Sequence, residues 1–192
     1  MGDYIFSLEG IEPVDATPYQ FLPIQLEWLE ALESGKFKQG RGQLRSSTDE
    51  YCCLGVLAEL SGCDRRLANI GTAYEYRDKN MSGKYTPPGF LPFGVRIAAR
   101  LHSDLGSFKR SIRFPGVYYG EPLISGNGHG SLASMNDVRI LQDDRTVRSF
   151  NFSEIAAYIR HDPWNIFTAP NVIDLSRPVP QLDMQPQAEG FA

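Results

Sequence analysis

The chain has 192 residues, of which 42% are hydrophobic and 22% charged, so it has an ordinary globular composition and enough length for one substantial core. Its formal net charge of -4 argues against a dedicated binder of nucleic-acid backbones, and nonspecific nucleic-acid binding is not expected. Three cysteines make no disulfide framework, which favours a reducing, cytoplasmic compartment. No apolar run reaches the roughly 18 residues of a membrane span, so no membrane anchor is expected.

The sequence predicts three parts. Residues 1–21 mix short apolar pairs with glycine and prolines and predict an extended arm. Residues 22–168 predict a single α+β domain, with about four helices packed against a small, mainly antiparallel sheet. Residues 169–192 are rich in Pro, Gln and Asp without periodicity and predict an irregular tail.

The first helix is predicted over Pro23–Ser34. Proline suits a first helical position, apolar residues recur at helical spacing with Trp28 facing inward, and Ser34-Gly35 ends the run. The densest basic segment of the chain follows, at Lys36–Arg45. Its glycines and alternating polar residues predict a short strand or hairpin that leads into the next helix.

The core helix is predicted over Ser47–Ser61. Ser47 and Glu50 have the spacing of a capping box, and Gly62 stands where a left-handed residue would end the helix. The segment between them is apolar on almost all sides, which predicts an enclosed helix. Gly55 in its middle costs about 1 kcal/mol relative to Ala, so we expect another backbone element to pack closely against it.

Later elements follow the same rules of periodicity and capping. The pattern predicts a strand at Thr72–Tyr76, a helix at Leu91–Ser103, short or edge strands within Phe108–Ile124, a glycine-rich loop at Gly126–Gly130, a brief helix at Ser131–Asp137 capped by Ser131, a strand at Val138–Leu141, a return strand from Val147 and a helix at Asn151–Arg160. For the last helix, Asn151 with Glu154 forms a capping box, and Phe150 with Ile155 has the spacing of a hydrophobic staple.

One hypothesis for chemistry is a cysteine nucleophile. Cys52 stands in the first turn of the predicted core helix, where partial positive charge lowers the pKa of a thiol. His129 could act as its base, and Asn136 or Asp137 could orient the imidazole. The alternative is a packed structural thiol, because cysteine is among the most buried residue types. We favour the structural alternative and therefore assign no catalytic residue.

The second hypothesis is a site for a small anion. The basic segment offers Gln39, Arg41 and Arg45 as donors, and the Gly126–Gly130 loop offers backbone N–H groups together with Asn127 and His129. Asn136 and Asp137 border this loop and complete the predicted ligand-binding set. Structural alternatives remain open for each part. The basic segment can be a solvated strand face, the glycine-rich loop an ordinary connection, and Asn136-Asp137 a helix end that bonds its own backbone. No His, Cys or carboxylate set has metal spacing, so neither a metal nor a cofactor is predicted.

Several motifs together resemble a family of small uncharacterised proteins common in bacteriophages and their bacterial hosts. The resemblance spans roughly residues 28–160. Its motifs are Trp28, Ala31-Leu32-x-x-Gly35, Gln39, Gly42-Gln-Leu44, Tyr51-Cys-Cys-Leu-Gly-Val-Leu57, Met135-Asn-Asp137 and Phe152-x-x-Ile-Ala156. It implies phage or prophage origin and carries no activity with it.

The sequence therefore leads to one favoured function and two rivals. We expect a phage-type intracellular binding protein that captures a small anionic ligand, such as a nucleotide signal, and interferes with host signalling or defence. The rivals are a cysteine-dependent hydrolase or transferase, and a protein that binds a host protein through Tyr118, Tyr119 and the arm. The sequence leaves the oligomeric state open.

Overall fold

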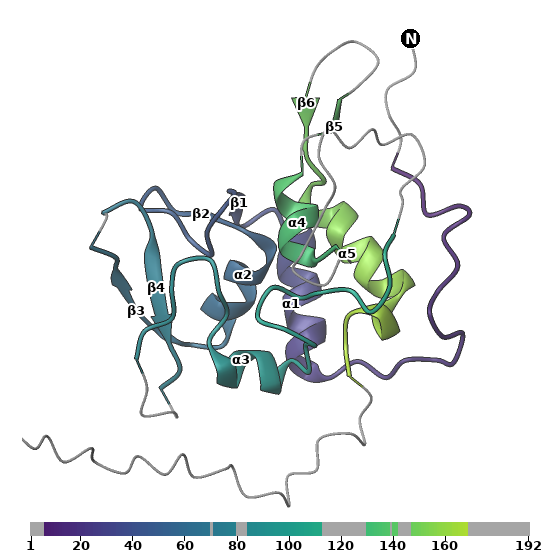
Figure 1. The fold of residues 1–192 in the computed structure, drawn as a ribbon, viewed down its shortest axis with the longest axis horizontal. Coiled ribbons are helices and arrows are strands. Elements are labelled where there is room, and N and C mark those ends of the chain that lie inside the picture. Colours follow the sequence, from purple (N-terminus) through teal and green to yellow (C-terminus); the bar gives the residue numbers. More distant parts are fainter. Residues whose placement is uncertain are drawn as a thin grey trace, which may run out of the picture.

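A computed structural model describes residues 6–69, 71–79, 84–112, 130–138, 140–141 and 147–168. Its helices and strands are, in chain order, α1 (Pro23–Glu33), β1 (Lys38–Gln39), β2 (Glu50–Tyr51), α2 (Cys53–Leu60), β3 (Asp64–Leu67), β4 (Tyr74–Arg77), α3 (Phe93–Ala98), α4 (Leu132–Asp137), β5 (Ile140–Leu141), β6 (Val147–Arg148) and α5 (Phe152–His161), followed by a 3-10 helix at Pro163–Asn165 (Figure 1). The described residues form one α+β domain, as predicted, with five α-helices where about four were expected.

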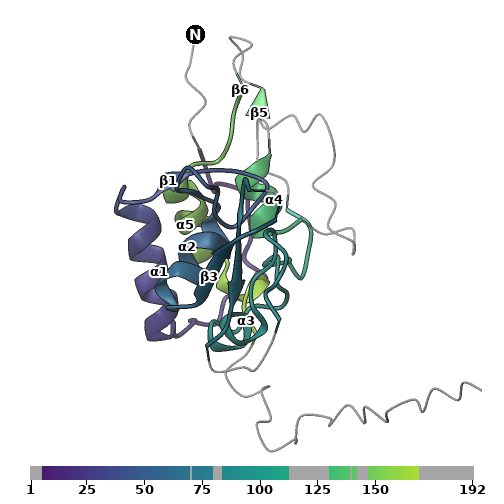
Figure 2. The same ribbon diagram turned by 90° about the vertical axis from the view of Figure 1, so that its left-hand side faces the viewer.

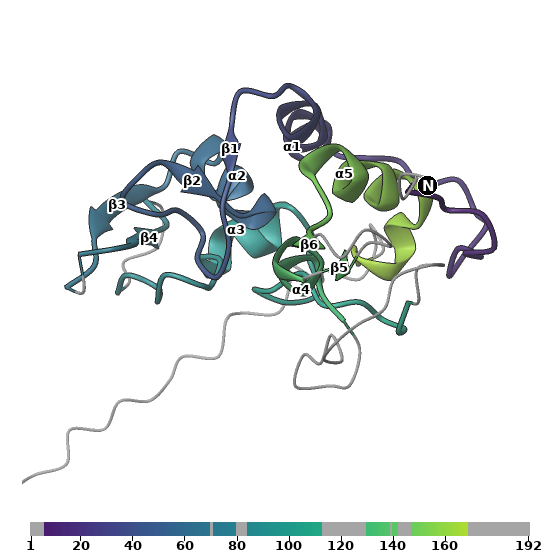
Figure 3. The same ribbon diagram turned by 90° about the horizontal axis from the view of Figure 1, so that it is seen from above.

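Helix α2 lies at the centre of the domain, between α1 and α4 (Figure 2). The β3–β4 hairpin lies beyond α2 on the side away from α5, whereas α1 and α5 pack side by side (Figure 3). Every residue from Cys53 to Ala58 is buried. The prediction of an enclosed core helix is therefore confirmed.

The predicted start of this helix is wrong by six residues. Helix α2 begins at Cys53, and its cap is the Cys52 sulfur, which accepts a hydrogen bond from the Gly55 N–H at 3.3 Å. The residues before it make a turn instead: the Ser46 hydroxyl accepts from the Thr48 and Glu50 N–H groups. A serine side chain that bonds nearby backbone offers the chain an alternative to helix, and here that alternative is adopted.

The prediction for Gly55 is confirmed. A Cβ atom at this position would lie 1.7 Å from the carbonyl oxygen of Leu44. The same oxygen accepts a hydrogen bond from the Cys52 N–H at 3.1 Å. The backbone at Leu44 is therefore held directly against the first turn of α2. Only a residue without a side chain allows this approach.

The other predicted caps agree with the structure. Helix α1 starts at Pro23 as predicted, and Trp28 is fully buried, with its indole N–H donating to the Cys53 carbonyl at 2.8 Å. Ser131 caps α4 by accepting from the Ser134 N–H. Asn151 and Glu154 form both bonds of the predicted capping box of α5.

Two predictions about the middle of the chain need correction. Helix α3 covers only Phe93–Ala98 of the predicted Leu91–Ser103, because Arg100 adopts a positive φ of 54° and turns the chain away. The strand predicted at Thr72–Tyr76 is β4, but its antiparallel partner β3 lies in a stretch for which no strand was predicted.

The strands form three separate two-stranded sheets, β1–β2, β3–β4 and β5–β6. The last two are antiparallel, whereas β1 pairs with β2 in parallel, Lys38 opposite Glu50 and Gln39 opposite Tyr51. The expected single, mainly antiparallel sheet is thus replaced by small pairs, each only two to four residues long. Most of the burial comes from the helices and connecting segments.

The described part of the N-terminal arm, residues 6–21, contains no helix or strand and lies along the end of α5 (Figure 1). Three hydrogen bonds hold it there. The Val14 N–H donates to Asp162 at 2.8 Å, His161 Nε2 donates to the Ile11 carbonyl at 2.5 Å, and the Trp164 indole donates to the Thr17 carbonyl at 2.7 Å. The strands predicted beyond residue 112 in Phe108–Ile124, the loop up to residue 129 and the tail from residue 169 lie outside the described residues.

Candidate functional site

Of the two segments predicted to form an anion site, the described residues Asn136 and Asp137 meet the basic segment in the fold. The Asn136 side chain is fully buried, and its oxygen accepts from the Gln39 amide at 3.0 Å and from the Cys53 N–H at 3.2 Å. Its amide donates to the Gly40 carbonyl and to Asp137, both at 2.8 Å. Asn136 therefore joins α4, the segment after β1 and the start of α2, and all its hydrogen-bonding groups are used inside the protein.

Asp137 closes the same network. Its carboxylate accepts from the Gly42 N–H at 3.0 Å. Burial raises the pKa of Asp137, against the lowering effect of the bonds from Asn136 and Gly42 and of the Arg41 charge. The backbone donor that could have met a ligand at Gly42 is thus already paired. The junction of Gln39, Asn136 and Asp137 therefore holds structural elements together. Arg41, which lies next to it, is exposed to solvent.

Arg45 belongs to a separate buried cluster. Its guanidinium lies over the rings of Tyr51 and Tyr74, 5.1 and 4.8 Å from their centroids, and forms ion pairs with Asp49 and Glu59 at 2.7 and 3.2 Å. A side chain held by two rings and two carboxylates supports the packing of β2 and β4 on α2. We therefore leave Arg45 out of the anion site.

The thiols do not have the setting of a nucleophile. Cys52 is buried and its sulfur caps α2, and burial raises the pKa of its thiol to about 12. Burial also raises the pKa of Cys53. Cys52 does stand at the N-terminus of α2, as the hypothesis of a reactive thiol required. The loss of hydration nevertheless raises its pKa by more than the backbone hydrogen bonds lower it. His129 and Asn127 lie outside the described residues, so the proposed base is not placed.

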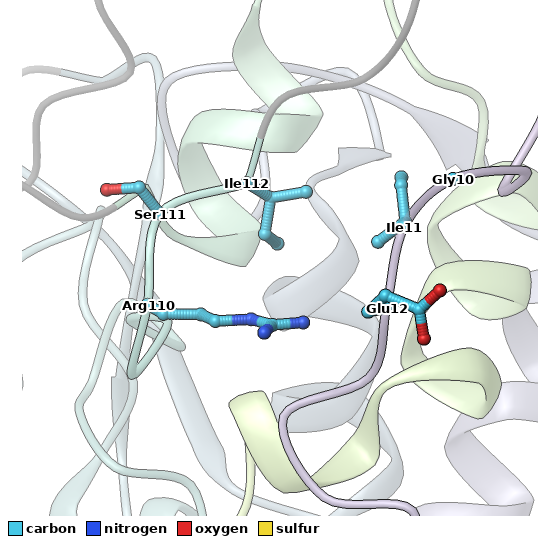
Figure 4. A pocket seen from close by; sticks show the side chains of 6 residues that line it. All are labelled: Gly10, Ile11, Glu12, Arg110, Ser111 and Ile112. Atoms are coloured by element: carbon cyan, nitrogen blue, oxygen red, sulfur yellow. The ribbon is translucent and has the colours of Figure 1, made fainter.

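A pocket that the sequence did not indicate opens between the arm and the segment after residue 107. It has a volume of about 290 Å³, and the described residues that line it are Gly10, Ile11, Glu12, Arg110, Ser111 and Ile112 (Figure 4). The Arg110 guanidinium extends across the pocket toward the arm, and the Glu12 carboxylate points away from it. Ile11 and Ile112 supply the apolar surface.

The backbone of Arg110 is held by hydrogen bonds, whereas its guanidinium has only a long ion contact among the described residues. Its N–H donates to the Asn165 side chain at 2.8 Å, and its carbonyl accepts from the same amide. Among the described residues, the ion partner of its guanidinium is Asp162, at an N···O distance of 3.8 Å, which is too long for a hydrogen bond. The Arg110 side chain is 46% exposed, so this pair contributes little and the guanidinium can receive an anion.

Asp162 stands behind the pocket. It is fully buried at the end of α5 and accepts from the Val14 N–H of the arm and, at 3.4 Å, from the Tyr158 hydroxyl. One carboxylate thus contacts the arm that forms one wall and the arginine of the other wall. The arm is bonded to the C-terminal end of α5, and Arg110 is bonded to Asn165 of the following 3-10 helix, so the pocket depends on both contacts.

Sequence reasoning missed Arg110, Ile11 and Asp162. The one local signal was the pair Lys109-Arg110 between apolar Phe108 and Ile112, which marks a basic side chain beside an apolar strip. Nothing in the sequence shows that residues 10–12 and 110–112, about a hundred positions apart, face each other.

The fold and the pocket define a compact α+β protein with an arginine-containing pocket between its N-terminal arm and its body. No helix in the described ranges is long and apolar enough to cross a membrane, and these ranges contain no group of three His, Cys or carboxylate side chains arranged for a metal ion. Residues 23–162 match the family described as "Domain of unknown function (DUF8296)", and the chain belongs to that family. No curated protein and no solved structure shows significant similarity to the chain.

Proposed function

We propose that the protein binds a small anionic ligand, and that the ligand occupies the pocket lined by Arg110. The supporting observation is the exposed guanidinium that extends into a cavity of about 290 Å³ and has only a 3.8 Å ion contact among the described residues. Arginine offers several N–H donors in a fixed plane that matches carboxylate and phosphate oxygens. The proposed anion site thus lies between the arm and residues 110–112, and not at the Gln39–Asp137 junction that the sequence suggested.

A binding role fits better than a thiol enzyme. The Cys52 thiol is buried, serves as a helix cap and has a pKa raised to about 12, so it offers little thiolate at neutral pH. The family match carries no activity. In the setting implied by the resemblance to phage proteins, the ligand would be a host metabolite or signal in the bacterial cytoplasm, and capturing it would interfere with host signalling or defence.

A thermal-shift screen tests the proposal. The panel contains inorganic phosphate, short carboxylates, nucleoside monophosphates and cyclic nucleotides, each at low and high salt. A ligand that binds only the folded protein stabilises it by about 2.7 kcal/mol at a hundredfold excess over its dissociation constant. We expect at least one anion to raise the melting temperature, with a smaller rise at high salt.

Two variants locate the site. Arg110→Gln should remove the shift and leave the unliganded melting temperature almost unchanged, because the paired backbone of residue 110 is retained. Arg66→Gln is the matched control, since Arg66 is an exposed arginine on β3 that pairs with Glu75. A shift that persists in Arg110→Gln, or the absence of any shift across the panel, contradicts the proposal.

A further inference from the structure

We infer that the Arg110 pocket selects a monoanion with a short apolar body, with a carboxylate or a phosphodiester head at Arg110 and the apolar part between Ile11 and Ile112. This inference rests on the proposed function and names its ligand class. Figure 4 shows the arrangement: the guanidinium and the Ile112 side chain both extend from the 110–112 segment toward the arm, and Ile11 stands opposite them.

The charge around the pocket favours a single negative charge. Arg110 is the cation among the described lining residues, and the buried carboxylate of Asp162 lies 3.8 Å from its guanidinium. Glu12 also lines the pocket, but its carboxylate points away from it (Figure 4). The nearby Lys109 ammonium is placed over the Trp164 ring, 5.9 Å from its centroid. A ligand with several phosphate charges would meet one guanidinium whose charge Asp162 already offsets, which disfavours it.

The walls favour an apolar body over a nucleobase. Ile11 is 9% exposed and Ile112 packs against the edge of the hydrophobic core. Burial of each ligand methylene between such side chains should tighten binding by about fourfold. The described lining residues include no aromatic ring, so they offer no stacking surface of the kind that commonly holds a base. This makes a nucleotide a poorer fit than an aliphatic acid.

The size of the cavity limits how far affinity can rise with the length of the ligand's apolar chain. A volume of about 290 Å³ stands at the lower end of the range of small-molecule sites. We therefore expect affinity to rise along a series of straight-chain acids and then to level off once the chain fills the space between the two isoleucines. Branched chains that match Ile11 and Ile112 in shape should reach this level with fewer carbons.

Isothermal titration of the full-length protein tests the ligand class. The probes are acetate, butanoate and hexanoate, the uncharged butanamide and hexanamide, the singly charged diester methyl butyl phosphate, AMP and ATP. Hexanoate should bind at least tenfold more tightly than both acetate and hexanamide, and ATP should bind more weakly than hexanoate. Equal affinity for hexanoate and hexanamide would overturn the inference, because the guanidinium would then play no part.

Variants separate the two halves of the site. Arg110→Gln should abolish the difference between acid and amide. Ile112→Asn should abolish the gain with chain length, and the milder Ile112→Val, with one methylene fewer, should reduce it if Ile112→Asn does not fold. Arg66→Gln should change neither. A chain-length gain that survives in a folded Ile112→Asn overturns the placement of the apolar body.

The outcomes distinguish this inference from the proposed function. If AMP or ATP binds in an Arg110-dependent manner and the aliphatic acids do not, the protein is an anion binder and the ligand class inferred here is wrong. If no probe binds and the thermal-shift panel is also silent, both proposals fail. If hexanoate binds equally well to Arg110→Gln, the pocket is not the site.

Discussion

At Gly55 the backbone of α2 packs directly against the backbone of Leu44. Alanine would favour the helix by about 1 kcal/mol, but its Cβ would overlap the Leu44 carbonyl oxygen. We expect Gly55→Ala to lower the free energy of unfolding by at least about 3 kcal/mol, as overpacking against backbone cannot be relieved by a rotamer change. Urea unfolding measures this, with Gly89→Ala as control, where the added Cβ would meet Gly42 at an ordinary 3.8 Å. A midpoint for Gly55→Ala equal to the control would show that α2 and Leu44 are further apart.

Cys52 should be unreactive in the folded protein. With a pKa of about 12 instead of 9.0, its thiolate fraction at neutral pH is about a thousandfold lower than that of an exposed thiol. Iodoacetamide labelling followed by mass spectrometry should be slow for Cys52 in native protein and fast in urea. Rapid, selective labelling of native Cys52 would restore the hypothesis of a cysteine nucleophile.

At the scale of elements, the turn before α2 depends on Ser46 and not on Ser47. The Ser46 hydroxyl accepts from two N–H groups, whereas Ser47 is exposed and outside the helix. Ser46→Ala should therefore cost about 1–2 kcal/mol, and Ser47→Ala should stay within about 0.5 kcal/mol of wild type. Chemical denaturation of the two neighbouring variants gives the comparison. The reverse order of midpoints would place the helix cap back at Ser47.

Asn136 joins elements that are too short to be stable alone. Removal of its side chain leaves the Cys53 N–H, the Gly40 carbonyl and the Gln39 amide without their buried partner. Since each unsatisfied buried group costs about 1–3 kcal/mol, Asn136→Ala should lose at least about 3 kcal/mol. Asn151→Ala, which removes only the cap of α5, should lose about 1 kcal/mol in the same assay. Equal losses would mean that the junction contributes no more than one cap.

For the whole molecule, His102 predicts a loss of stability in mild acid. Burial, with the positive charge of Lys109, lowers the pKa of His102 to about 4 from 6.5, and its Nε2 is buried without a partner in the described part of the chain. Because the unfolded chain takes up the proton first, this stabilisation is complete above about pH 6.5 and is lost as the pH falls toward 4. The loss would reach about 3 kcal/mol for a fully buried imidazole and should be smaller here, because His102 is half-buried and solvent screens part of the effect.

Urea midpoints at pH 7, 5 and 4 test this expectation. His102→Gln should be less sensitive to acid than wild type over that interval, because the remaining carboxylates titrate in both proteins. Parallel curves for the two proteins would show that His102 is accessible to solvent and titrates near its ordinary pKa. His102 follows α3 and contacts the chain just after the 3-10 helix, where its N–H donates to the Ile166 carbonyl at 3.3 Å.

The sequence by itself determined the features that depend on near neighbours. The capping box of Asn151 and Glu154, the Ser131 cap, the first helix at Pro23 and the enclosed character of α2 were all predicted and confirmed. The physical reason is that caps, turns and amphipathic faces are set by residues three or four positions apart. Even Gly55 could be interpreted correctly, because a glycine inside a buried helix has a cost that a close contact explains.

Only the tertiary structure decided which polar groups are free. Gln39, Asn136 and Asp137 looked like ligand donors, but contacts over nearly a hundred residues pair them with one another. Arg45 is likewise held by Glu59 and two tyrosine rings, and the start of α2 is set by the Ser46 turn and the Leu44 carbonyl. The Arg110 pocket needs the arm, residues 110–112 and Asp162 at the end of α5 together, and no local pattern encodes how three distant segments pack.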